Sequence, residues 1–130
     1  MPPDTKKTIA RLYTLVAKLP LEAYLSSENF NSFCREYDLT DTWKEHSESS
    51  KDRPDVYGRE TTRQAFILFF DHLLQTRPLE FLEILAAFLQ DIGEYSAQPV
   101  PVDAIKKVCV HLGFPTNTVD DECVKIKSRN

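Results

Sequence analysis

Histidine and cysteine are the residues of this chain whose chemistry could support catalysis or metal binding, and both are sparse. Three of each occur among 130 residues, and the cysteines are Cys34, Cys109 and Cys123. Covalent catalysis needs a nucleophile beside a base, and zinc sites place several His or Cys ligands at characteristic spacings. The sequence contains no CxxC, HExxH, GxSxG or glycine-rich phosphate motif. We therefore expect no enzyme activity, no cofactor and no metal.

The histidines lie far apart in the sequence, and we expect them to be isolated from one another in space. His72 follows Asp71, a carboxylate that could tune an imidazole. The pair lies within a run of apolar residues, so we interpret it as the narrow polar seam of a helix. Cys109 and His111 are two residues apart, which places them on different faces of a helix.

Basic residues form two groups, one near each end of the chain. The groups are Lys6, Lys7 and Arg11, and then Lys106, Lys107, Lys125, Lys127 and Arg129. Together they could bind phosphate, so the alternative function is a nucleic-acid-binding helical domain that uses the C-terminal helix and basic tail. The net charge of −4 argues against this reading, since nucleic-acid-binding domains usually carry a basic excess.

Acidic residues concentrate in the segment from Gln64 to Val100. Its acids are Asp71, Glu80, Glu83, Asp91 and Glu94, and its one base is Arg77. A segment with this excess of negative charge attracts a basic partner. The simpler interpretation is that these acids form an ordinary solvated face.

The elements that carry these residues are predicted to be helices. Apolar residues recur at i, i+3, i+4 and i+7, and only three glycines occur. Helices are expected at about 5–18, 28–37, 40–46, 59–75, 78–92 and 102–112, with a loop over 47–58. The fold class is therefore all-α, a compact bundle of five to six helices. It comprises a helical bundle domain over 1–115 and a polar C-terminal tail over 116–130.

The segment from Arg59 to Ile92 is the most distinctive part of the bundle. It reads as two helices that are apolar nearly all the way round, joined by the short connector Thr76-Arg77. A short connector favours antiparallel neighbours, so we expect a central, strongly apolar antiparallel hairpin. The residues expected at its buried centre are Phe66, Phe69, Phe70, Leu82, Leu85 and Phe88.

A helix that is apolar on every side must be covered on every side. Five short helices cannot easily cover this hairpin, and monomers rarely expose large apolar patches. We therefore expect the hairpin to be a docking surface. The candidate interaction residues are Phe66, Phe70, Glu80, Glu83, Ala87 and Asp91.

The expected function is a non-catalytic helical protein-interaction or assembly module, for example the recruiting domain of a larger effector or regulatory system. The expected partner is another protein or a second copy of the chain, with a homodimer as the simplest case. No apolar run approaches the roughly 20 residues that cross a bilayer. Three widely spaced cysteines argue against a secreted disulfide framework. We therefore expect a cytoplasmic protein that binds neither membrane nor, as its main function, nucleic acid.

Overall fold

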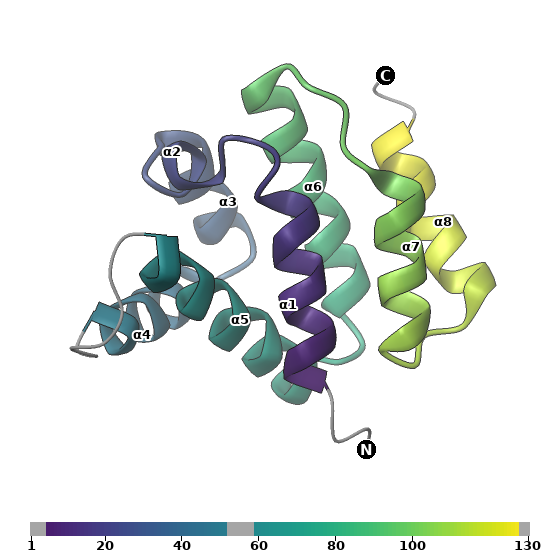
Figure 1. The fold of residues 1–130 in the computed structure, drawn as a ribbon, viewed down its shortest axis with the longest axis horizontal. Helices are drawn as coiled ribbons and strands as arrows, with labels where there is room; N and C mark the ends of the chain where they lie inside the picture. The colour runs from purple at the N-terminus through teal and green to yellow at the C-terminus, as the bar shows by residue number, and fades with distance from the viewer. Residues whose placement is uncertain (1–4, 52–58, 128–130) are drawn as a thin grey trace.

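The computed structural model describes residues 5–51 and 59–127, and this part of the chain is helical without any strand (Figure 1). Its eight helices are α1 (Thr5–Val16), α2 (Leu21–Leu25), α3 (Glu28–Glu36), α4 (Thr40–Lys51), α5 (Arg59–Thr76), α6 (Phe81–Ser96), α7 (Val102–His111) and α8 (Thr116–Lys127). The all-α fold class is confirmed. The predicted number of five to six helices is too low.

Local sequence explains several helix boundaries. The Ser27 hydroxyl accepts a hydrogen bond from the backbone N–H of Phe30 at 3.3 Å, which caps the start of α3. Asp38 lies just after the C-terminal end of α3 and has a positive φ of 57°, a conformation that Asp tolerates better than most residues. Gly113 follows α7 with a φ of 105°, where any residue with a Cβ would be strained.

The polar tail expected over 116–130 is instead a helix, α8, over Thr116–Lys127. Val119, Cys123 and Ile126 are buried, and they recur at i, i+4 and i+7, which is a helical period. This period was not recognised in the sequence because most of the segment is polar. Residues 128–130 lie outside the described residues.

The loop predicted over 47–58 is only partly tested. Helix α4 continues through Lys51, five residues past the expected end at His46. The remainder of that expectation, at 52–58, lies outside the described residues.

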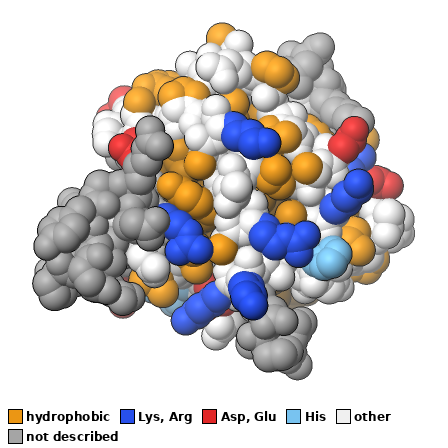
Figure 2. Space-filling model, in the orientation of Figure 1, with side chains coloured by type: hydrophobic (Ala, Val, Ile, Leu, Met, Phe, Trp, Pro, Cys, Tyr) orange, Lys and Arg blue, Asp and Glu red, His pale blue; other side chains and the backbone are white. Residues whose placement is uncertain are grey.

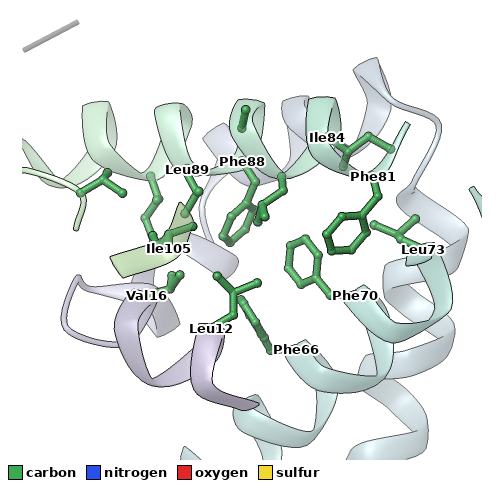
Figure 3. Close-up of a cluster of buried hydrophobic side chains, with 14 of the residues drawn as sticks. Leu12, Val16, Phe66, Phe70, Leu73, Phe81, Ile84, Phe88, Leu89 and Ile105 are labelled. Carbon is green, nitrogen blue, oxygen red and sulfur yellow. The ribbon is translucent and has the colours of Figure 1, made fainter. Parts of the chain in front are cut away.

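Aromatic rings form the centre of the core, as predicted. Phe66, Phe69, Phe70 and Phe88 are each 1% exposed, and Leu82 and Leu85 are also buried. In Figure 3, Leu12 and Val16 of α1 and Phe66 and Phe70 of α5 point toward Phe88 and Leu89 of α6. The core therefore joins α1 to α5 and α6, which lie far from it in the sequence.

The antiparallel hairpin predicted for α5 and α6 is not confirmed. Helix α5 packs mainly against α4 and α1, whereas α6 packs mainly against α8, α3 and α2 (Figure 1). The two helices meet through rings, with the centroids of Phe70 and Phe88 separated by 5.4 Å. Because both helices are apolar on most sides, each is surrounded by several partners and does not pair along the length of the other.

Other helices of the same chain cover the apolar surface of α5 and α6 that was expected to remain exposed. Among the described residues, the exposed large apolar side chains are Leu79, Tyr95, Val110 and Val124. They belong to the α5–α6 connector, the end of α6, α7 and α8, and they do not form the hairpin surface predicted above. Over the described ranges, none of the helices is both long enough and apolar enough to cross a membrane.

Candidate interaction faces

Helix α1 carries Lys7 and Arg11 on one exposed side, four residues apart and so on one helical face. Lys18 follows in the turn after the helix ends at Val16, and we name these three residues the basic stripe. The turn continues past Val16, since the Ala17 N–H donates to the Tyr13 carbonyl at 2.8 Å. The three cations are exposed, whereas Ile9, Leu12 and Val16 on the other side are buried.

Figure 2 shows that Lys and Arg side chains spread over the face that contains α1 and parts of α5 and α7. Apolar side chains lie between them, and the visible Asp and Glu side chains lie near the margins. Among the described residues, the basic stripe makes no ion pair with an acid. Lys106 of α7 differs, since its Nζ lies 3.1 Å from Asp120.

Helix α6 carries a stripe of opposite sign on its outer side. Glu83, Ala87, Asp91 and Glu94 follow one another at intervals of four, four and three residues, so they share a face. Next to this stripe, α3 and α6 enclose a groove of about 320 Å³, which we name the acidic groove. Its lining is Asn29, Ser32, Phe33, Glu36, Tyr37, Ala87, Gln90, Asp91 and Glu94.

Asp91 is the acid of the groove that is most constrained by its surroundings. Tyr24, which is 0% exposed, donates a hydrogen bond from its hydroxyl to Asp91 Oδ2 at 2.5 Å. Partial burial raises the pKa of the Asp91 carboxyl, and the charges of Glu94 and Glu36 raise it further. The hydrogen bond from Tyr24 opposes this rise. The groove therefore brings together the carboxyl groups of Glu36, Asp91 and Glu94.

The structure separates the six candidate interaction residues into two sets. Phe66 and Phe70 of α5 are 1% exposed and lie in the core, so their assignment to a docking surface is wrong. Glu80 and Glu83 are exposed, and Ala87 and Asp91 line the acidic groove. The helical period alone is enough to place Glu83, Ala87 and Asp91 on one side of α6. No sequence pattern indicated that α1 and α4 would pack on α5 and cover Phe66 and Phe70.

Glu80 has a local structural role at the start of α6. Its carboxylate accepts a hydrogen bond from Arg77 at 2.7 Å, and this ion pair lowers the pKa of Glu80. Arg77 also donates to the backbone carbonyl of Tyr37 at 2.9 Å. This contact ties the α5–α6 connector to the end of α3.

The expectation that the histidines are isolated is wrong for His46 and His72. Their ring centroids are 4.9 Å apart, because α4 packs along α5. Burial and the neighbouring His72 lower the pKa of His46. Asp71 is buried and accepts a hydrogen bond from Gln75 at 3.0 Å. Among the described residues, no three His, Cys, Asp or Glu side chains are grouped so that they could hold a metal ion.

The three cysteines are buried as free thiols. Burial raises the pKa of Cys34 and of Cys109 to about 12. Since the thiolate is the reactive form, neither side chain is arranged as a nucleophile at neutral pH. Both behave as small apolar core residues.

The side chains of α8 that the structure describes include no Lys or Arg. The middle of the helix carries Asp120, Asp121 and Glu122, and Asp120 forms an ion pair with Lys106. The side chains of Lys125 and Lys127 lie outside the described residues. The exposed cations that the fold brings together belong instead to α1 and its neighbours.

No protein-family model, curated protein or solved structure matches this chain.

Proposed function

We propose that this chain is a non-catalytic protein-interaction module that assembles with other copies of itself through charged faces. The observation that supports this proposal is the separation of charge. The basic stripe lies on α1, and the acidic groove lies between α3 and α6.

Separated charge favours association more than scattered charge does. Single exposed ion pairs contribute little to stability, but complementary charged faces steer encounters and determine their orientation. Salt screens such forces, with a Debye length of about 8 Å at physiological ionic strength. Assembly through these faces is therefore expected to weaken as salt is raised.

The interaction role is the one inferred from the sequence, but the surface that performs it is different. The apolar side chains of α5 and α6 stabilise the fold, since they are buried within one chain. The residues left for recognition are the exposed charges of α1 and α6 and the half-buried floor of the groove.

Binding of nucleic acid is the second candidate function, because the exposed cations of the basic stripe suit phosphate groups as well as carboxylates. The acidic groove and the net charge of −4 would repel a polyanion at longer range. Self-assembly uses both charged faces, whereas nucleic-acid binding uses one and is opposed by the other.

Sedimentation of the purified chain over a wide concentration range, at low and at high salt, tests the proposed function. We expect the mass to rise above 15.0 kDa with concentration at low salt and to return toward it at high salt. A parallel titration of a fluorescently labelled DNA duplex tests the second candidate. A chain that stays at 15.0 kDa under every condition contradicts the proposed function. If that chain also binds the duplex, the second candidate is favoured.

A further inference from the structure

We infer that assembly is head-to-tail, with the basic stripe on α1 of one copy lying along the acidic groove between α3 and α6 of the next copy. This inference rests on the proposed function and adds to it the identity of both contacting surfaces. It differs from the two-fold dimer expected from the sequence.

The two surfaces match in length. The basic stripe runs from Lys7 to Lys18, and the acidic stripe that borders the groove runs from Glu83 to Glu94. The acidic stripe covers eleven helical residue steps, or about 16 Å at 1.5 Å per residue. The basic stripe covers the same number of residue steps, the last two of them past the end of α1 at Val16, so the two stripes are similar in length.

The two surfaces also match in charge. Lys7, Arg11 and Lys18 are exposed and make no ion pair among the described residues. On the other surface, Glu36 approaches Asp91 from α3, and the mutual repulsion contributes to the raised pKa of Asp91. A cation placed between these carboxylates would relieve the repulsion, and nearby opposite charges favour the ionised form of an acid.

The shape and lining of the groove suit a long basic side chain. A volume of about 320 Å³ admits side chains but not a whole helix. Phe33, Tyr37 and Ala87 supply apolar and aromatic contacts beside Glu36 and Asp91. Arginine and lysine bury their aliphatic stems on apolar surface while the charged group remains at its edge. Arg11, in the middle of the basic stripe, is the side chain that we assign to the groove.

The two surfaces face away from each other within one chain. Leu12 and Val16 on the buried side of α1 point toward α6 (Figure 3), so the basic stripe lies on the side of α1 that is turned away from α6. Phe88 and Leu89 of α6 point back toward α1, and the acidic stripe lies on the outer side of α6. Two copies joined by one such contact therefore still have an unoccupied basic stripe on one copy and an unoccupied acidic groove on the other. Such heterologous contacts produce filaments or rings.

The inference is tested by reversing one charge on each surface. Arg11→Glu alters the basic stripe, and Glu36→Lys alters the groove. Each has a matched control on α4 that makes the same change in net charge, Lys44→Glu for the first and Glu48→Lys for the second. All four side chains are exposed, so the variants are expected to fold, and circular dichroism checks this.

Sedimentation at low salt is the measurement. We expect the wild-type mass to pass twice 15.0 kDa with increasing concentration. Arg11→Glu and Glu36→Lys should each require about tenfold or more protein to reach the same mass, because like charges then face each other, while the α4 controls behave as the wild type. An equal mixture of the two variants should recover association, since one copy keeps an intact stripe and the other an intact groove.

Three results would overturn the inference while leaving the proposed function in place. They are a wild-type mass that stops at a dimer, a Glu36→Lys variant that assembles as well as Glu48→Lys, and a mixture no heavier than its components. A wild-type chain that remains at 15.0 kDa throughout instead contradicts the proposed function, and the inference with it.

Discussion

Truncation of Phe88 to alanine should destabilise this fold more than truncation of most other side chains. Phe88 is 1% exposed and lies near the middle of α6. Its ring lies within 6.2 Å, centroid to centroid, of five aromatic rings: Tyr24 from α2, Phe30 and Phe33 from α3, and Phe66 and Phe70 from α5. It therefore links α6 to three other helices.

The magnitude follows from burial and from the lost ring contacts. A buried Phe→Ala change typically costs about 3–5 kcal/mol, through lost burial and a residual cavity. Edge-to-face aromatic pairs contribute roughly 0.5–1.5 kcal/mol each beyond area, and all five pairs of Phe88 are edge-to-face, with interplanar angles from 66° to 87°. We expect the upper end, about 4–5 kcal/mol, out of a total of about 5–15 kcal/mol for a domain.

Thermal unfolding followed by circular dichroism measures the effect. For a chain of this size, about 3–5 °C per kcal/mol gives a fall in Tm of roughly 12–25 °C. Phe114→Ala is the matched control, since Phe114 is half-buried and stacks on Phe81 alone among the ring pairs of the described residues. Its cost should be less than half as large. A Phe88→Ala protein that unfolds with the parent would refute the assignment of this ring to the centre of the core.

Three further outcomes follow from individual side chains. The folded pKa of His46 lies below its ordinary value of 6.5, so its contribution to stability is present above pH 6.5 and is lost as the pH falls through the folded pKa. In urea unfolding, His46→Gln should therefore lose less unfolding free energy on acidification than the parent does. An identical loss of unfolding free energy in the two proteins would contradict this. The three buried cysteines should react with a thiol reagent only after unfolding, and rapid reaction in the native state would show that a thiol is accessible. Tyr24→Phe removes the hydroxyl that donates to Asp91 and should cost about 1.5–3 kcal/mol of unfolding free energy; an unchanged urea midpoint would show that the hydrogen bond contributes nothing.

Local sequence predicted the parts of this fold that depend on a single helix. The i, i+3, i+4, i+7 spacing located most helices, and it placed Phe66, Phe69 and Phe88 in the core, where they lie. The same spacing places Glu83, Ala87 and Asp91 on one side of α6. It also marks Val119, Cys123 and Ile126 of α8, a signal that was present in the sequence and not used.

The remaining features depend on which helices pack together, and a single sequence does not specify that. Glu36 joins Asp91 at the groove because α3 packs on α6, and His46 meets His72 because α4 packs on α5. The apolar surface of α5 suggested a docking site, but α1 and α4 cover it. Periodicity reports which side of a helix is apolar, and it does not reveal whether the same chain or a partner covers that side.

Exchanging the charges of the basic stripe and the acidic groove tests whether these two faces complement each other. A variant with Lys7→Glu, Arg11→Glu, Glu36→Lys and Glu94→Lys keeps the net charge of −4 while reversing the sign of both surfaces. Sedimentation at low salt should show this variant assembling with itself at concentrations close to those of the wild type, because the complementarity is preserved. A variant that folds and yet remains at 15.0 kDa where the wild type assembles would show that the two faces do not associate through complementary charge.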